Sequence, residues 1–552
     1  MTDTPATVTA TAGGDPGLGR SGAAWTVRDA TFEVMRRFGM TTIFGNPGST
    51  EVSFLTDLPA DIEFVLALHE GSAVGIASGY AIARGEPSFV NLHTAPGLGN
   101  AINAIANARD TRAPLVVVVG QQDRRQIAFE PFLTGRALDR LAGEYPVWSQ
   151  TPIRAQDVPG TIARAYHEAK AAAGPALVVV PMSDWEQPAD ELAANAPAHV
   201  VRAASISSTE LHELVELVAR AENPAIVVGA GSDSPEGWGA LVALAERLHC
   251  PVWQEPFGAR AGFPQDHPLF AGHLHWRRRL MRDALAPHDL VLVVGTNAFR
   301  LYLFEQPEPP VAPGTRVAVI TADPAEAHRS PCELAVVAPV AAACAALVEQ
   351  CSRRDGPAPA PFERPPAPAP PGPGEPLRSA HVLAALADRL PADVVLLEES
   401  PSAKPELHQR IRARAPLGFV SNANGGLGFG IPGAIGLRMG LPDRPVVAVL
   451  GDGSALFAIQ ALWTAAHYEV GVLMVVMANG GYGAMDAQAQ ARGGIGAWPA
   501  FPGVEIAGIA RCLGCAAIRV QTHEQLLSAL DEALADPAAR TQPLLIEVGV
   551  AQ

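Results

Sequence analysis

Residues 446–483, VVAVLGDGSALFAIQALWTAAHYEVGVLMVVMANGGYG, contain the pattern that decides the fold. Two apolar runs, at 446–450 and 472–477, have the length of buried strands, and a glycine-containing loop follows each run. The residues between the runs predict a helix over 458–471. Strands joined in this way lie parallel, so their following loops meet at one edge of the sheet, where α/β proteins bind ligands. The segment therefore predicts an α/β unit with a ligand site at that edge.

The same alternation of short apolar strands and helical segments extends over most of the 552 residues. It predicts three doubly wound α/β domains in series, each with a mostly parallel sheet. The expected bounds are 25–190 for the N-terminal domain, 200–350 for the central domain and 377–552 for the C-terminal domain. We expect residues 1–24 to form a disordered tail and the proline-rich residues 351–376 to form an extended linker.

Composition excludes several classes of protein. Hydrophobic residues make up 48% of the chain and charged residues 17%, which rules out global disorder. The formal net charge is −16 and no basic stripe is present, so we expect no nucleic-acid partner. No apolar stretch reaches the roughly 20 residues that span a bilayer, so we expect no membrane segment. Six cysteines in so long a chain do not make a disulfide framework, which favours the cytoplasm.

The two loops after the strands carry oxygen ligands. Asp452 offers a carboxylate and Asn479 offers an amide oxygen. Mg²⁺ is commonly held by one carboxylate, a few neutral oxygens and the phosphates of a ligand. The neighbouring glycines let the backbone approach a diphosphate and leave amides free to donate hydrogen bonds. A Gly-Asp-Gly sequence alone is often only a turn, but its strand context and the paired loop favour a binding site.

This pattern resembles the motif GDG…N of thiamine-diphosphate enzymes, and Asn479 follows Asp452 by 27 residues, as in that family. The resemblance implies that Mg²⁺ is bound by Asp452, Asn479 and the main-chain oxygen of Gly481. Ala478 replaces the first asparagine of the pair that the family has at this place.

The resemblance also implies contacts with the cofactor. The Gly425 carbonyl would meet the aminopyrimidine amine, and a bulky apolar residue, Leu427 or Met485, would hold the cofactor bent. Ser400 and Ser402 fall where the family contacts the diphosphate, whereas Pro401 has no amide to donate. The remaining expected cofactor contacts are Gly453, Ser454 and Tyr482. Glycine-mediated helix–sheet packing is the alternative reading of the segment 425–430, and a dinucleotide fingerprint there is weak.

Three further candidates lie in the N-terminal domain, each at the end of an expected strand. Glu70 stands at a strand-to-helix junction, where a carboxylate is either a helix-start charge or a catalytic group. Ser49 lies in the turn after one strand, and His93 begins a glycine-rich loop after another. A lone histidine is usually a satisfied polar group, but its position at the shared edge of the sheet favours a functional role.

Four N-terminal segments resemble benzoylformate decarboxylases, members of the thiamine-diphosphate-dependent 2-oxo acid decarboxylase family. These segments are FGNPGST (44–50), LHEGSAVGIASGYA (68–81), NLHTAPGLGNAINAIANA (91–108) and PLVVVVGQQ (114–122). The resemblance implies that Glu70 bonds the aminopyrimidine ring nitrogen and that Ser49 and His93 face the substrate. The family has a further active-site histidine in the central domain after a Phe-Arg pair. Here Phe299-Arg300 is followed by no nearby histidine.

The resemblance implies a thiamine-diphosphate- and Mg²⁺-dependent, non-oxidative decarboxylase. Its substrate would be a small 2-oxo acid, benzoylformate-like or branched, and its product an aldehyde, with carboligation as a side activity. It also implies self-association as a dimer or tetramer, with active sites at the subunit interface. An acetolactate-synthase-like carboligase and a catalytically silent binding or regulatory homologue stay open as alternatives.

Overall fold

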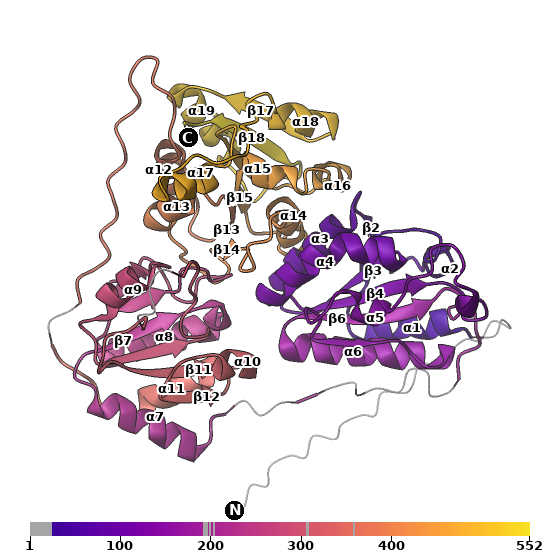
Figure 1. Ribbon diagram of the computed structural model, residues 1–552, viewed down its shortest axis with the longest axis horizontal. Coiled ribbons are helices and arrows are strands. Elements are labelled where there is room, and N and C mark those ends of the chain that lie inside the picture. The colour runs from indigo at the N-terminus through magenta and orange to yellow at the C-terminus, as the bar shows by residue number, and fades with distance from the viewer. Residues whose placement is uncertain are drawn as a thin grey trace, which may run out of the picture.

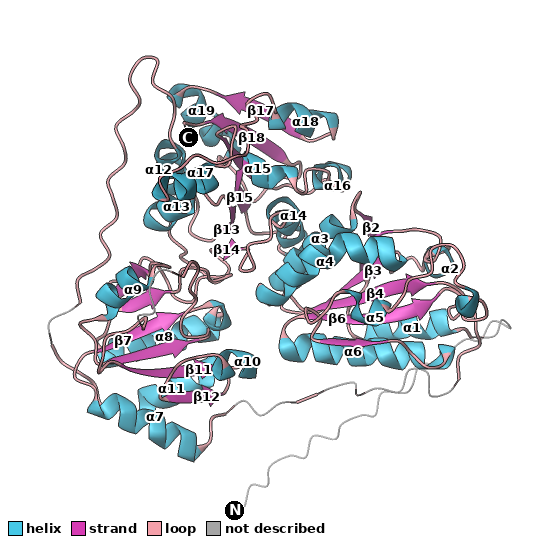
Figure 2. Cartoon of the chain, in the orientation of Figure 1, coloured by secondary structure: helices cyan, strands magenta, loops and turns pink. Residues whose placement is uncertain are grey.

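The computed structural model describes residues 25–190, 197, 200–201, 205–304, 309–356 and 359–551. Three six-stranded sheets follow one another along this part of the chain, and all strand pairs within them are parallel. Helices cover both faces of each sheet (Figures 1 and 2). The expected class, three doubly wound α/β domains in series, is confirmed, while the domain bounds stay a prediction.

The N-terminal sheet has the order β2-β1-β3-β4-β6-β5. Its strands are β1 (Thr42–Asn46), β2 (Glu63–Leu66), β3 (Ser88–Leu92), β4 (Leu115–Gln121), β5 (Trp148–Gln150) and β6 (Pro175–Pro181). Its helices are α1 (Val27–Arg37), α2 (Val52–Leu55), α3 (Glu70–Arg84), α4 (Thr94–Asp110), α5 (Leu138–Leu141) and α6 (Val158–Ala172), with the 3₁₀ turns η1 (Ile127–Phe129) and η2 (Ala155–Asp157). Because helices lie on both faces, β3, β4 and β6 are buried throughout, which explains their unbroken apolar sequences.

The central sheet has the order β12-β11-β10-β7-β8-β9. Its strands are β7 (Pro224–Val228), β8 (Val252–Gln254), β9 (Phe270–His273), β10 (Leu290–Val294), β11 (Arg316–Thr321) and β12 (Leu334–Val337). Its helices are α7 (Ser208–Arg220), α8 (Pro235–Leu248), α9 (Arg278–Leu285), α10 (Pro324–His328) and α11 (Val340–Gln350), with the 3₁₀ turn η3 (Ala230–Ser232). The fully buried β7 and β10 form its middle.

The C-terminal sheet has the order β14-β13-β15-β16-β18-β17. Its strands are β13 (Val395–Glu399), β14 (Val420–Ser421), β15 (Val446–Gly451), β16 (Leu473–Ala478), β17 (Ala516–Val520) and β18 (Leu544–Gly549). Its helices are α12 (Ser379–Ala387), α13 (Lys404–Arg410), α14 (Gly430–Gly440), α15 (Asp452–Leu456), α16 (Ala461–His467), α17 (Gly483–Ala491), α18 (Ile506–Cys512) and α19 (His523–Ala533). The strands β15 and β16 pair directly, so the loops that follow them leave the same edge.

The helix predicted over 458–471 is present as the shorter α16, and a further short helix, α15, precedes it. The chain forms two short helices, α15 and α16, joined by hydrogen bonds of the tighter i to i+3 type. The second helix ends at His467 because Glu469 adopts a left-handed φ of 54°. The parallel pairing of the two strands is unaffected by this difference.

The N-terminal and C-terminal domains pack on each other within one chain, through α3 and α14 (Figure 1). Both helices are rich in glycine where they cross. A Cβ atom at Gly79 would lie 2.1 Å from the carbonyl oxygen of Gly433, and one at Gly436 would lie 1.8 Å from that of Ile76. The glycines therefore allow backbone-to-backbone contact, and side chains at these places would separate the helices.

The linker contains no helix or strand over its described residues, yet it is bound to both neighbouring domains. Phe362 packs against the core of the central domain, and its amide donates to Phe270 O at 3.2 Å. Arg364 then reaches the C-terminal domain, donating to Gln409 O at 2.9 Å. The proline-rich segment thus carries anchoring side chains.

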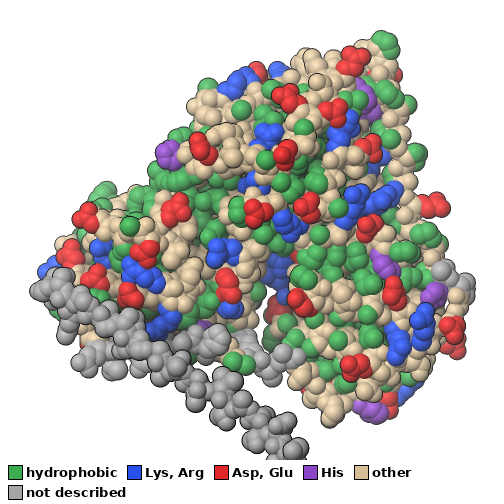
Figure 3. All heavy atoms as spheres, turned by 180° about the vertical axis from the view of Figure 1, so that it is seen from behind, with side chains coloured by type: hydrophobic (Ala, Val, Ile, Leu, Met, Phe, Trp, Pro, Cys, Tyr) green, Lys and Arg blue, Asp and Glu red, His purple; other side chains and the backbone are tan. Residues whose placement is uncertain are grey.

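The surface carries charges of both signs. On the face drawn in Figure 3, Lys and Arg side chains are interspersed with Asp and Glu. Within the described part of the chain, no helix is both long enough and apolar enough to cross a membrane.

Candidate active site

Glu70 is the first residue of α3 and is 7% exposed. Asn46, at the end of β1, donates to Glu70 Oε1 at 3.3 Å, and Asn100 of α4 donates to Oε2 at 3.0 Å. The helix start itself is capped by His69, whose ring accepts from Gly71 N–H at 3.1 Å. Since His69 supplies the cap, the Glu70 carboxylate is held by side chains from two other elements, as expected for a positioned functional group.

His93 precedes α4 and is mostly buried, with 14% of its side chain exposed. Its Nδ1 lies 3.0 Å from Glu51 Oε2 and 3.0 Å from Thr50 Oγ1. An ionised carboxylate can only accept, so this contact places the ring proton on Nδ1 and leaves Nε2 able to take up a proton.

Glu51 is the buried partner that sequence reasoning missed. It is 1% exposed, accepts from Gly48 N–H at 2.8 Å and is also bonded by the Thr50 hydroxyl. Burial raises the pKa of its carboxyl, an effect that these hydrogen bonds and His93 oppose. Nothing in its sequence position, two residues after Ser49, signals burial; the contact with His93 spans 42 residues and exists only in the folded chain.

Close backbone approach brings Glu70, His93 and the loop before Ser49 together. A Cβ atom at Gly97 would lie 3.3 Å from His93 Cβ and 3.4 Å from Glu70 Cγ. A Cβ atom at Gly48 would lie only 2.4 Å from the His93 ring. Ser49 follows Gly48 and is exposed. The three predicted N-terminal residues thus belong to one small region at the carboxyl ends of β1 and β3.

The C-terminal candidates gather at the carboxyl ends of β15 and β16. Asp452 is 6% exposed, and its two oxygens accept from Gly453 N–H and Gly480 N–H, both at 2.7 Å. These bonds join the two predicted loops directly. Burial raises the pKa of Asp452, and the backbone amides oppose that effect.

The loop after β16 also faces the segment after β13. A Cβ atom at Gly483 would lie 3.0 Å from Asn479 Nδ2 and 3.2 Å from Ser402 Oγ. A Cβ atom at Gly453 would lie 3.2 Å from the Tyr482 ring. A side chain at either glycine would therefore crowd these neighbours, which shows that the three strand ends lie close together.

The other predicted cofactor contacts differ in their exposure. Ser400 and Ser454 are buried, Leu427 is half-buried, and Tyr482 and Met485 are exposed. Gly425 has a φ of +85°, which a side chain would strain. Gly481 is buried, and its amide donates to Asn479 Oδ1 at 3.1 Å.

The loop before α14 is held by a second buried carboxylate that sequence reasoning missed. Glu399, at the end of β13, accepts from the amides of Gly428, Phe429 and Gly430 at 3.0–3.1 Å. Burial raises its pKa to about 7, while these amides favour the charged form. On the other side, Asn107 of α4 donates to Gly426 O at 2.7 Å. The segment that carries Gly425 and Leu427 is thus fixed by both domains.

The N-terminal and C-terminal candidates form two separate groups. Among the described residues, no hydrogen bond or ion pair joins Glu70 or His93 to Asp452 or Asn479. His273 of the central domain belongs to neither group, because its ring stacks on His408 at 3.8 Å. It therefore does not take the place of the histidine expected after Phe299-Arg300.

Comparison with known proteins identifies the family. Three models of thiamine pyrophosphate enzymes match the chain: the N-terminal TPP binding domain at residues 25–140, the central domain at 211–347 and the C-terminal TPP binding domain at 403–548. The chain is 39% identical over 530 residues to benzoylformate decarboxylase of Pseudomonas aeruginosa, covering 95% of this chain and 98% of that protein.

The chain belongs to the thiamine-diphosphate-dependent 2-oxo acid decarboxylases.

A solved structure supports the same assignment. The thiamine diphosphate-dependent 4-hydroxybenzoylformate decarboxylase of Rhodococcus jostii RHA1 superposes with a TM-score of 0.90 at 36% identity, over 95% of this chain and 99% of that one. An acetolactate synthase large subunit from Parasynechococcus marenigrum is more distant, at 26% identity over 96% of this chain and 87% of that protein. The decarboxylase assignment is therefore favoured over the acetolactate-synthase-like alternative.

The donor set at the C-terminal loops fits the metal and diphosphate of this family. Asp452 supplies one carboxylate, Asn479 an amide oxygen and Gly481 a main-chain oxygen, all of the hard type that Mg²⁺ prefers. Across the described residues, no group of three or more His, Cys, Asp and Glu side chains could hold a metal ion. A site with a single carboxylate suits a cation that takes its remaining ligands from a diphosphate.

Proposed function

We propose that this decarboxylase converts an aromatic 2-oxo acid of the benzoylformate class into carbon dioxide and an aldehyde, without oxidation. The observation that carries the proposal is that Glu70 and His93 both lie close to Gly97. The His93 ring is held in place there by its contact with Glu51. Two relatives support the substrate class, because one is named a benzoylformate decarboxylase and the other a 4-hydroxybenzoylformate decarboxylase.

Thiamine diphosphate, when bound, supplies an electron sink for the electrons released as carbon dioxide leaves. We propose that Asp452, Asn479 and Gly481 hold Mg²⁺, and that Ser400, Ser402, Gly453, Ser454 and Tyr482 line the diphosphate end. Gly425, Leu427 and Met485 would contact the rings. Glu70, buried and held by Asn46 and Asn100, would bond the pyrimidine ring nitrogen through a charge-assisted hydrogen bond.

His93 and Ser49 would act on the substrate. With its proton on Nδ1 toward Glu51, the His93 ring presents Nε2 for proton exchange with the substrate. Ser49 is exposed next to Gly48, which packs on that ring, so its hydroxyl can bond the substrate carboxylate. Positioned acid–base groups of this kind contribute about 10²–10⁴ in rate.

We further propose that two copies of the chain complete each active site. The cofactor-binding loops and the Glu70 region form separate groups within one chain, and α3 and α14 of the same chain pack on each other. A second copy would then bring its Glu70 region to the C-terminal loops of the first, in a dimer or a tetramer.

The proposal is tested with purified protein, thiamine diphosphate and Mg²⁺. Carbon dioxide and aldehyde are measured across aromatic, branched and short 2-oxo acids. We expect equal yields of both products, with the highest kcat/KM for the aromatic class. Carbon dioxide accompanied by a hydroxyketone would indicate a carboligase instead. No turnover on the whole panel by protein with bound cofactor would contradict the proposal.

Removal of the metal provides a separate test. Because one carboxylate and neutral oxygens hold Mg²⁺ weakly without the diphosphate, prolonged treatment with a chelator should remove both metal and activity. Added Mg²⁺ with thiamine diphosphate should restore activity in the unmodified chain but not in the Asp452→Ala variant. Full activity in metal-free buffer would rule out the proposed metal site.

A further inference from the structure

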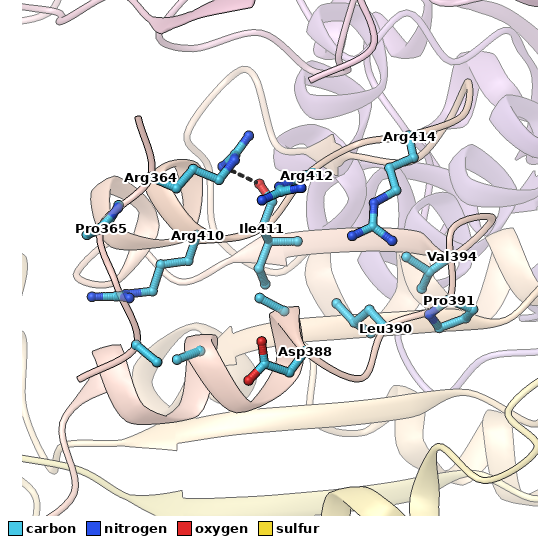
Figure 4. A pocket seen from close by; sticks show the side chains of 13 residues that line it. Arg364, Pro365, Asp388, Leu390, Pro391, Val394, Arg410, Ile411, Arg412 and Arg414 are labelled. Atoms are coloured by element: carbon cyan, nitrogen blue, oxygen red, sulfur yellow. Dashed lines mark hydrogen bonds between the residues drawn. The ribbon is translucent and has the colours of Figure 1, made fainter. Parts of the chain in front are cut away.

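A cavity of about 360 Å³ lies outside the candidate active site, between the linker, α12 and the residues that follow α13. Its size is within the range of small-molecule sites, about 300–1,000 Å³. Four arginines line it, Arg364, Arg410, Arg412 and Arg414, together with a single carboxylate, Asp388 (Figure 4). Such a concentration of positive charge stands out in a chain whose net charge is −16.

The cavity lies at the opposite edge of the C-terminal sheet from the cofactor-binding loops. Val394, which lines it, directly precedes β13, whereas Ser400 directly follows that strand. A strand of five residues spans roughly 17 Å at about 3.3 Å per residue. The cavity is therefore a separate site.

The local backbone places the arginines together. Arg410 ends α13, and Ile411 after it is extended, with φ −92° and ψ 143°. Ile411 and Ala413 are buried, so the alternating Arg412 and Arg414 are directed outward.

The linker brings the fourth arginine to the cavity. Arg364 is fixed by backbone carbonyls, with 2.9 Å to Gln409 O and 3.0 Å to Gln265 O. Burial, together with the nearby Arg412 and Arg414, lowers its pKa to about 10, and Asp266 opposes this effect. The guanidinium groups thus repel one another in the unliganded protein, and an anion between them would remove that repulsion.

Most of this positive charge is not in an ion pair, although Asp388 lines the cavity and Asp266 acts on Arg364. Arg410 pairs with Glu406. Within the described part of the chain, the other three arginines form no ion pair, and Arg412 and Arg414 form no hydrogen bond either. Planar guanidinium groups match the oxygens of phosphates in paired hydrogen bonds. The terminal nitrogens of Arg364 already donate to backbone carbonyls, so Arg412 and Arg414 are the arginines that suit a ligand with more than one negative charge, and Arg364 adds positive charge beside them.

Opposite the arginines, the side chains are mostly apolar, apart from Asp388. Figure 4 shows Leu390, Pro391 and Val394 across from the row of arginines, and alanines of α12 complete this wall. A ligand that fits both sides carries its charge at one end and a flat, apolar group at the other. We propose that this cavity binds a nucleotide-class polyphosphate, with the phosphates on Arg412 and Arg414, beside the charge of Arg364, and the base against the apolar wall.

The experiment uses the holoenzyme saturated with thiamine diphosphate and Mg²⁺, so that the diphosphate loops are occupied. ADP, pyrophosphate and adenosine are titrated separately by isothermal calorimetry at low ionic strength. We expect one ADP per chain, weaker binding of pyrophosphate and no measurable binding of adenosine. Raising NaCl to about 0.5 M should weaken ADP binding, because salt screens the arginines.

Two sets of variants assign the binding to the cavity. The Arg412→Gln/Arg414→Gln double variant should weaken ADP binding at least about tenfold, since each substitution removes a charge-assisted hydrogen bond. The Arg353→Gln variant, at an exposed arginine after α11, should bind ADP like the unmodified chain. Thermal melting checks that each variant is folded, and Arg414→Gln alone replaces the double variant should that one fail to fold.

Several results would overturn the proposal. One is the absence of binding for both ADP and pyrophosphate. Another is ADP binding that the double variant leaves intact, which would indicate a different site. Equal weakening by Arg353→Gln would indicate non-specific charge attraction. Pyrophosphate that binds as tightly as ADP would overturn the assignment of a nucleotide, because the apolar wall would then add no affinity for the base.

Discussion

Replacement of the Glu70 carboxylate by an amide tests the most buried of the proposed catalytic groups. Gln keeps the shape of the side chain but removes its charge. Its amide group also places a donor against Asn46 or Asn100, each of which donates to the Glu70 carboxylate. We expect Glu70→Gln to lower kcat/KM by at least about 10²-fold, the lower end of general acid–base contributions. Steady-state kinetics and a melting curve measure this, with the exposed Glu349→Gln as the control. Turnover equal to that of the control would refute the role of Glu70.

The buried Glu255 of the central domain is expected to make the stability of the protein depend on pH. It is 5% exposed, its Oε2 has no hydrogen-bond partner among the described residues, and burial raises its pKa to about 7. The folded state therefore binds a proton more tightly than the unfolded state, so the unfolding free energy falls as pH rises from about 4.5 to about 7.

The variant Glu255→Gln lacks this titration. We expect its stability relative to the unmodified chain to increase between pH 5 and pH 8, by up to about 3 kcal/mol at 1.36 kcal/mol per pKa unit. Melting temperatures at several pH values measure the difference. A gap between the two proteins that stays constant with pH would show that Glu255 has an ordinary pKa.

At the scale of elements, the crossing of α3 and α14 leaves no room for a side chain. A Cβ atom at Gly436 would lie 1.8 Å from Ile76 O, so Gly436→Ala must push the two helices apart. We expect a loss of about 1–3 kcal/mol in unfolding free energy, typical of overpacking, together with weaker cofactor binding through the loop before α14. Denaturant unfolding measures the loss of unfolding free energy.

The matched control for the helix crossing is Gly239→Ala in α8. No heavy atom lies within 4 Å of a Cβ atom built there. Alanine at this helical position should leave the protein unchanged or stabilise it by up to about 1 kcal/mol. Equal destabilisation by both substitutions would mean that close helix approach is not the cause.

At the scale of the whole molecule, the proposed shared active site predicts complementation between two inactive chains. Glu70→Gln and Asp452→Ala each abolish one half of the site. In a mixed dimer, one of the two sites then receives both intact halves, so a statistical mixture regains about a quarter of the activity. Co-expression and kinetic assay of the mixture measure this. Sites built within a single chain would give no recovery in any mixture.

Much of the architecture and part of the site follow from local patterns in the sequence. Apolar runs of strand length, glycine-rich loops and helical segments depend on nearby residues, so the α/β class and the pairing of the Asp452 and Asn479 loops could be predicted. The helix expected over 458–471 is present as α16 but is shorter, because the tight turn before it delays its start and the left-handed Glu469 follows its end.

The partners of the buried side chains were decided only by the tertiary structure. Glu51 meets His93 across 42 residues, and Asn100 meets Glu70 across 30. The arginine cavity joins the linker to residues about 50 positions further along the chain. The sequence by itself determined strands, loops and the residue types at their ends, because these depend on neighbouring residues. Burial, and with it the pKa and the hydrogen-bond partners of each carboxylate, depends on which distant elements pack together.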